Sequence, residues 1–190
     1  MFYKLLSIIC WGLLILCPSV KSWSASPSDI SLSSCTDKKL GITFLCGADW
    51  ELETDQDAIL AVISEDPAVT LTVARTKSPV KFVEQLSWPV LRELGQYASS
   101  GFTTKPLKLA GDEALEVNGI PEDFPEMKLR DFYILHGDYL YSVLFSVNPR
   151  QALKDYQPLF NKIIGSIQFQ QSESSGEPTE VPSAGQLTDQ

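Results

Sequence analysis

Histidine is almost missing from this chain of 190 residues: His136 is the only one. Cys35 and Cys46 with one distant histidine offer too few ligands for a structural zinc site. The chain also contains no G-x-S-x-G elbow, no G-x-x-x-x-G-K-S/T phosphate loop, no G-x-G-x-x-G turn and no H-E-x-x-H pair. The sequence therefore shows none of the familiar hydrolase, nucleotide-binding or metalloprotease motifs.

His136 itself stands in the sequence His136-Gly137-Asp138, between two stretches rich in apolar residues. Glycine with polar neighbours is typical of a hairpin turn. A catalytic histidine would need a nucleophile and an orienting group beside it, and the sequence identifies neither. We expect His136 to face solvent in a turn and to take no part in catalysis.

Long apolar runs are missing too, since a bilayer span takes about 20 residues. The apolar run 5–17 follows the positive charge of Lys4 and precedes small residues at Ser22 and Ser24. This order is typical of a secretory signal peptide. We expect residues 1–24 to be removed and the product to be exported. Its destination would be a periplasm, the cell exterior or, in a photosynthetic organism, the thylakoid lumen.

Cys17 is the residue that could carry a lipid anchor in place of simple secretion. A lipid-modified cysteine is expected to follow a small residue, whereas Leu16 precedes this one. The sequence therefore favours a secreted soluble protein, with no transmembrane segment in the mature chain.

Positive charge is in deficit. The chain has 24 acidic residues against 15 Lys and Arg, a formal net charge of −9. Removal of residues 1–24 takes away two lysines and lowers this to −11, and the segment 170–190 holds four acidic residues and no Lys or Arg, which leaves −7 on the folded part. Such a surface repels nucleic acid and anionic lipid, so we expect neither as a partner. The segment 170–190 has too few apolar residues to offset the entropy of ordering and is predicted to be a disordered acidic tail.

Two cysteines, Cys35 and Cys46, remain after the signal peptide. In an exported protein an even pair favours a disulfide bond. The alternative is that Cys46 is a buried strand residue and Cys35 a free thiol.

Alternating and short continuous apolar patterns predict a β-rich domain of roughly 140 residues. We expect the stretch 49–52 to resume the first strand after a break at Gly47, and the loop 118–125 to lead into a C-terminal hairpin. The predicted strands are 41–46, 49–52, 58–63, 69–73, 107–109, 114–117, 129–135, 139–147 and 166–169.

Two helices are predicted between the strand groups. The first begins at Ser78-Pro79 and ends at Gly101, with a kink or two abutting helices at Pro89. Its buried stripe is Val83, Leu86, Val90, Leu94 and Tyr97. The second begins at Asn148-Pro149 and is interrupted at Pro158. Its inner face is Tyr156, Leu159, Phe160, Ile163 and Ile164.

This order predicts an α+β fold with a central antiparallel β-sheet flanked by helices. The element order, the Gly41-Ile-Thr-Phe opening strand followed by Trp50, and the Ser166-Ile-Gln-Phe ending resemble the PsbP-like domain family. The resemblance covers residues 39–169 and leaves 25–38 as an N-terminal lead-in. It implies a sandwich around that sheet and a role as an accessory or binding protein. It identifies no functional residue, because the shared positions are core positions.

An acidic ladder occupies every second position from 49 to 57: Asp49, Glu51, Glu53, Asp55 and Asp57. On a strand this spacing puts the carboxylates on one face, where several oxygens could hold calcium. The ladder lacks the glycine-containing loop of an EF-hand, and an ordinary solvated strand face has the same pattern. We predict no cofactor and keep calcium as the alternative.

Two further groups could serve recognition. Glu122, Asp123 and Glu126 form a second acidic cluster in a loop bounded by prolines, and such loops often carry binding residues. Five aromatic residues could line a cleft, although packing against a helix fits their spacing better. They are Phe132, Tyr133, Tyr139, Tyr141 and Phe145.

The sequence as a whole favours an exported, non-enzymatic accessory or binding protein that contacts another protein or a small ligand. Two alternatives stay open: a periplasmic hydrolase that uses carboxylates alone, and a calcium-dependent structural protein. The sequence names neither ligand nor partner.

Overall fold

The structure is a computed structural model that describes residues 27, 30–87, 89–91 and 102–170. The predicted signal peptide, and the predicted tail beyond residue 170, lie outside the described residues. Contacts along the chain divide it into two units, 1–30 and 31–190. Every element named below belongs to the second unit.

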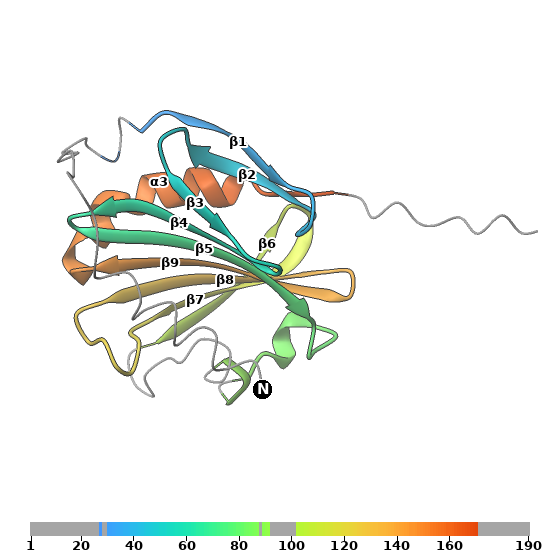
Figure 1. The fold of residues 1–190 in the computed structure, drawn as a ribbon. Helices are drawn as coiled ribbons and strands as arrows, with labels where there is room; N and C mark the ends of the chain where they lie inside the picture. Colours follow the sequence, from blue (N-terminus) through green and yellow to red (C-terminus); the bar gives the residue numbers. More distant parts are fainter. Residues whose placement is uncertain (1–26, 28–29, 88, 92–101, 171–190) are drawn as a thin grey trace, which may run out of the picture. The chain divides into compact units, whose positions relative to one another are not determined.

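Two antiparallel sheets organise this unit (Figure 1). The large sheet has seven strands in the order β3-β4-β5-β9-β8-β7-β6, and the small sheet has the order β1-β2-β10. The elements are β1 (Leu32–Asp37), β2 (Ile42–Gly47), β3 (Glu51–Thr54), β4 (Ala58–Glu65), β5 (Ala68–Lys77), the 3-10 helix η2 (Val83–Gln85), β6 (Thr103–Leu109), β7 (Asp112–Gly119), β8 (Lys128–His136), β9 (Tyr139–Asn148), the 3-10 helix η3 (Arg150–Ala152), α3 (Leu153–Gly165) and β10 (Gln168–Phe169). The predicted α+β class is confirmed. No helix among the described residues is long and apolar enough to cross a membrane.

One face of the large sheet packs against α3, which lies beside the small sheet in Figure 1. Tyr141, Val143, Phe145 and Val147 point to this face because alternate residues of a strand share a side. Each is at most 3% exposed. The ring of Phe145 stacks on Phe160 of α3 with centroids 4.1 Å apart, so this face forms the main contact between sheet and helix.

The opposite face packs against the segment around η2. Apolar side chains of β7, β8 and β9 pack there against Val83, Leu86 and Leu91 and form a second hydrophobic cluster. Its buried members are Val83, Leu86, Leu91, Leu115, Val117, Leu129, Tyr133 and Leu140. The large sheet is therefore covered on both faces by described residues.

The helix α3 runs unbroken through Pro158, so the predicted interruption is wrong. A proline here removes the hydrogen bond to the carbonyl of Lys154. Both residues are exposed, and water can satisfy that carbonyl. The predicted inner face is buried in full, but α3 begins at Leu153, after η3, and not at Asn148-Pro149.

No helix begins at Ser78-Pro79, and that prediction is also wrong. The Ser78 hydroxyl donates to Val80 O at 2.6 Å and lies 3.2 Å from Val80 N, which closes a local turn. Serine side chains often compete with helix formation in this way. The first helical residues after this turn are those of the short helix η2.

A break does separate η2 from the next helical residues, 89–91. The first α-helical hydrogen bond there runs from Leu91 N to Ser87 O at 2.9 Å. The expected break is therefore present: Pro89 begins a new helical segment after η2. The predicted stripe residues Leu94 and Tyr97 lie outside the described residues.

The prediction that 49–52 resumes the first strand is wrong. The strand β3 belongs to the large sheet, whereas β2 belongs to the small sheet. The chain turns at Gly47, where Trp50 N donates to Gly47 O at 3.2 Å. The indole lies so close that a Cβ on Gly47 would be 2.2 Å from Trp50 Nε1. Only glycine fits this approach.

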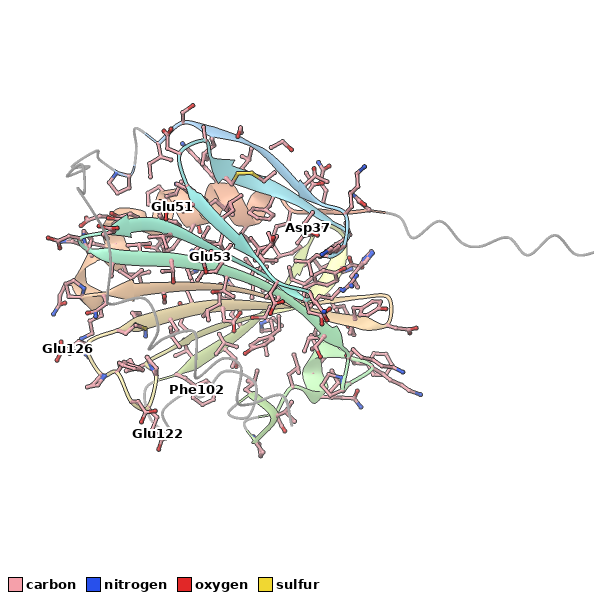
Figure 2. The ribbon with its side chains drawn as sticks, in the orientation of Figure 1. Asp37, Glu51, Glu53, Phe102, Glu122 and Glu126 are labelled. Carbon is pink, nitrogen blue, oxygen red and sulfur yellow. A yellow bond between two sulfur atoms is a disulfide. The ribbon has the colours of Figure 1, made fainter. Side chains whose placement is uncertain are left out.

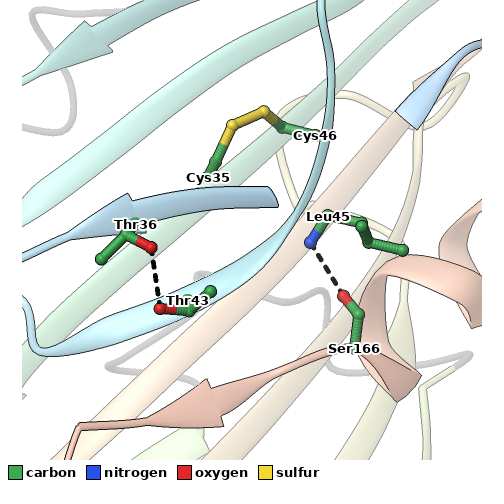
Figure 3. The surroundings of a disulfide bond; sticks show 6 residues. All are labelled: Cys35, Thr36, Thr43, Leu45, Cys46 and Ser166. Atoms are coloured by element: carbon green, nitrogen blue, oxygen red, sulfur yellow. Dashed lines mark hydrogen bonds between the residues drawn. A yellow bond between two sulfur atoms is a disulfide. The ribbon is translucent and has the colours of Figure 1, made fainter. Parts of the chain in front are cut away.

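The strand β1 was not predicted from the sequence pattern, because it lies in the lead-in and buries none of its side chains. It pairs with β2 along its whole length. Figure 3 shows the disulfide between Cys35 and Cys46 that joins the two strands, with Cα atoms 5.9 Å apart. The predicted bridge is confirmed. On the other side of β2, Leu45 N donates to Ser166 Oγ at 2.8 Å.

Reduction of this disulfide should lower the free energy of unfolding by about 3 kcal/mol, because the bond restricts a short loop of the unfolded chain. Denaturant unfolding with and without a reductant measures the change. A Cys35→Ser/Cys46→Ser double variant is the control and should match the reduced protein. Labelling of either cysteine by a thiol reagent in the unreduced, denatured protein would contradict the bridge.

Arg130 links the large sheet to α3. Its Nε donates to Glu116 Oε1 at 2.8 Å and its Nη1 to Asn161 Oδ1 at 2.7 Å. Burial raises the pKa of Glu116, but hydrogen bonds from Arg130 and Asn118 and the charges of Arg130 and Lys105 outweigh burial. The pKa of Glu116 is thereby held below its ordinary value of 4.5.

Replacement Glu116→Gln should lower the free energy of unfolding by about 1–3 kcal/mol at neutral pH, because a charged hydrogen-bond partner is lost. A lowered folded-state pKa means that the carboxylate stabilises the fold above its ordinary pKa and loses this effect as the pH falls through the folded value. The gap between variant and wild type in denaturant unfolding should therefore shrink from about pH 7 to about pH 3. A gap that does not change with pH would contradict this assignment.

Candidate functional site

Polar and aromatic side chains gather at the end of the large sheet where the β8–β9 hairpin turns. Gly137, at φ +58°, opens this two-residue turn without the strain that a side chain would bring. The register places His136 opposite Tyr139, and β5 places its last residues opposite Tyr139 and Tyr141. We call this group the tip cluster. Its members are Arg75, Lys77, Asp112, His136, Tyr139, Tyr141 and Phe169.

His136 is the last residue of β8 and not a turn residue open to solvent, so that expectation is wrong. Its Nδ1 lies 2.8 Å from Asp112 Oδ2, with side-chain exposures of 35% and 29%. The ring stacks on Phe169 with centroids 4.3 Å apart and an interplanar angle of 14°. His136 therefore joins the start of β7 to the last strand of the small sheet.

Tyr141 gives the tip cluster its rigid base. Its hydroxyl donates to Leu40 O at 2.6 Å in a buried setting. Burial raises the pKa of Tyr141 above its ordinary value of 10.0, and a hydrogen bond and the charge of Arg75 oppose that rise only in part. The phenol stays protonated at neutral pH and serves as a structural donor.

Arg75 and Tyr139 form the solvent-facing part. The guanidinium carbon of Arg75 lies 4.7 Å from the centroid of the Tyr139 ring, a cation–π arrangement. Tyr139 is 43% exposed, which is high for a large aromatic side chain. Among the described residues, Arg75 forms no ion pair with a carboxylate.

The acidic ladder follows β3 away from the tip cluster, except for its last residue, Asp57, whose backbone carbonyl accepts from Arg75 N at 2.9 Å. Its central residues Glu51 and Glu53 are exposed on β3, an edge of the large sheet, and Figure 2 shows them along that strand. Within the described residues, no group of three or more His, Cys, Asp and Glu side chains is placed to hold a metal ion. The calcium alternative stays a prediction.

The second acidic cluster lies in the loop between β7 and β8, where Figure 2 shows Glu122 and Glu126 well apart from β3. Backbone hydrogen bonds from Phe124 N to Pro121 O and from Met127 N to Phe124 O shape this loop. Phe124 is 46% exposed. The two acidic clusters are therefore separate features.

Of the five aromatic residues proposed for a cleft or a core, four are core residues: Phe132, Tyr133, Tyr141 and Phe145 are at most 3% exposed. Tyr139 is the exception. Sequence reasoning missed Arg75, Lys77, Asp112 and Phe169. Arg75 continues the alternation of β5 beyond its last apolar residue, which is the one signal that could have placed it on the Tyr139 side of the sheet.

The arrangement offers two kinds of chemistry. In a nucleophilic active site, a histidine acts as the general base and a carboxylate orients it. Among the described residues, the hydrogen bond of the His136 ring is to Asp112, and its other contacts are the rings of Tyr141 and Phe169. An exposed tyrosine with an arginine on its ring is the combination enriched at binding hot spots.

Replacement His136→Ala should lower the free energy of unfolding by about 1–2 kcal/mol, because it removes an aromatic stack and a hydrogen-bonded pair. The control Asp112→Asn keeps the stack and should cost less. Thermal and denaturant unfolding of both variants measure this. An unchanged unfolding midpoint for His136→Ala would show that the contacts contribute nothing.

Comparison with known proteins gives matches among solved structures alone: no family model matches the chain, and no curated protein matches it. Cyanobacterial PsbP (CyanoP) from Synechocystis sp. PCC 6803 is similar, with a TM-score of 0.52, 14% identity, and coverage of 80% of this chain and 98% of that one. The Ran-binding protein Mog1p of Saccharomyces cerevisiae is similar as well. Its TM-score is 0.51 at 11% identity, with coverage of 74% of this chain and 96% of that one. The chain therefore has the PsbP-like fold that its sequence resembles.

Proposed function

We propose that this protein is an exported, non-enzymatic accessory or binding protein that acts by contact with another protein through the tip cluster. The observation that carries the proposal is the exposed Tyr139 ring with the Arg75 guanidinium on it. Tyrosine and arginine supply much of the binding energy in protein interfaces, because they combine a large apolar area with directed hydrogen bonds.

The fold supports a binding role. A PsbP-like neighbour of similar coverage, Mog1p, is a Ran-binding protein, which is an instance of this fold serving protein recognition. The identities are too low to carry its partner over to this chain. Function resides in sites grafted on a fold, so the tip cluster is the feature to test.

Export is supported by the predicted signal peptide and by the disulfide between Cys35 and Cys46, since such bonds persist in oxidising compartments. N-terminal sequencing of the mature protein should begin near Ala25. Recovery of the chain from the cytosol with Met1 intact would contradict export.

A photo-crosslinking experiment tests the binding role. The photoreactive residue p-benzoylphenylalanine replaces Tyr139 in one sample and Phe124, which is similarly exposed but lies in the β7–β8 loop, in a control sample. Irradiation in the native compartment should give a discrete covalent adduct with a protein at position 139 and none of the same mass at position 124. No adduct at position 139, or the same adducts at both positions, would contradict the proposal.

A further inference from the structure

We propose that the tip cluster binds an acidic, extended segment of the partner protein, with Arg75 as the anchor for a carboxylate. This inference rests on the proposed function and adds the chemistry of the partner. It starts from a contrast between two arginines on the same face of the large sheet.

Arg130 is satisfied within the protein, because its guanidinium donates to Glu116 and to Asn161. Arg75 is half-buried, yet within the described residues it forms no ion pair with any carboxylate. A guanidinium presents its donors in a planar fork that matches a carboxylate. An arginine held in place without an acid partner is suited to receive one from outside.

The position of Arg75 is fixed before any ligand binds. The ring of Tyr139 lies under the guanidinium at 4.7 Å, and Arg75 also reaches the phenol of Tyr141. Tyr141 is in turn tied to Leu40 O. Because the side chain is already ordered, binding loses little conformational entropy.

The spacing of positive charge favours an extended segment over a single small anion. Arg75 and Lys77 are alternate residues of β5 on one side of the sheet, about 6.6 Å apart along the strand. The register places them opposite Tyr141 and Tyr139. Alternate side chains of an extended peptide have the same separation, so two of its carboxylates can meet the two cations while its backbone lies near the exposed Tyr139 ring.

The acidic residues near Arg75 leave this charge available. Asp112 is engaged by His136. Asp57 and Asp138 approach through their backbone carbonyls, which accept from Arg75 N and Ser78 N at 2.9 Å each. Lys77 is exposed and, like Arg75, has no ion pair among the described residues. Arg75 and Lys77 are thus two cations without a carboxylate partner beside the exposed Tyr139 ring.

Fluorescence anisotropy with a labelled peptide of alternating Glu and Thr, about eight residues long, tests the site on the full mature chain. The same peptide with Gln in place of Glu is the ligand control. We expect the Glu peptide to bind at least about tenfold more tightly. Arg75→Gln should remove most of this preference, and Arg75→Lys should retain part of it because the charge stays but the fork is lost. Lys154→Gln, the same charge change at an exposed position of α3, should leave binding within about twofold.

Equal binding of the two peptides, or unchanged binding by Arg75→Gln in a protein that unfolds at the wild-type temperature, would overturn the inference. If free glutamate binds as tightly as the peptide, the claim that the site recognises an extended segment is wrong. If the protein dimerises and Arg75→Gln abolishes the dimer, the ligand of the site is the acidic strand of a second copy. If truncation at Gln170 makes the peptide bind more tightly, the ligand is the chain's own tail. Either result would overturn a separate partner.

The crosslinking experiment keeps the two proposals apart. If Arg75→Gln still gives the adduct at position 139, the protein binds a partner there and the acidic chemistry is wrong. If the wild-type protein gives no adduct, the binding role itself is wrong.

Discussion

The register of β9 between β5 and β8 is the constraint on which the rest of the structure depends. It pairs with β5 and with β8 along nearly its whole length, and its inward residues carry the contact with α3. A slip of one residue would move Phe145 away from Phe160 and turn the hydroxyl side chains Ser142 and Ser146 toward the helix. The same slip would separate His136 from Tyr139, so the tip cluster exists only in the register that the core requires.

The small sheet is attached to this frame through contacts of its own. Tyr141 bonds to Leu40 O, His136 stacks on Phe169, and Ser166 bonds both to Leu45 N and to Ile163 O. The first two contacts start from side chains of the tip cluster. The tip cluster is therefore also one of the places where the two sheets are joined.

Patterns that repeat along the chain were predictable from sequence. The alternation in β5 and β9 and the inner face of α3 appear in the structure because each is a local consequence of burying one side of an element. Ser78-Pro79 and Pro158 were misjudged, since both depend on where a single side chain or carbonyl finds a partner. The strand β1 was missed because it contributes backbone hydrogen bonds and a disulfide but no buried side chain.

The candidate site was the least predictable part. Arg75, Asp112, His136 and Phe169 lie far apart in sequence and meet only through long-range strand pairing, which leaves no motif to recognise. The local sequence of His136 predicts a solvated turn residue, because it is the sequence of a turn. Its partners come from β7 and β10, and only the fold brings them together.

The two arginines show how the same residue type takes different roles on one sheet face. Arg130 lies among polar groups of the sheet and of α3, where an unpaired charge would be costly to bury, and the protein supplies Glu116 to match it. Arg75 lies at the rim, where water can hydrate it in the free protein and its cost is small. Charges in such a place add little to stability, so the fold gains little from keeping Arg75 ordered over a tyrosine ring. The ordered position of the Arg75 side chain favours ligand binding instead, because a carboxylate that displaces water from the guanidinium meets hydrogen-bond donors already in position.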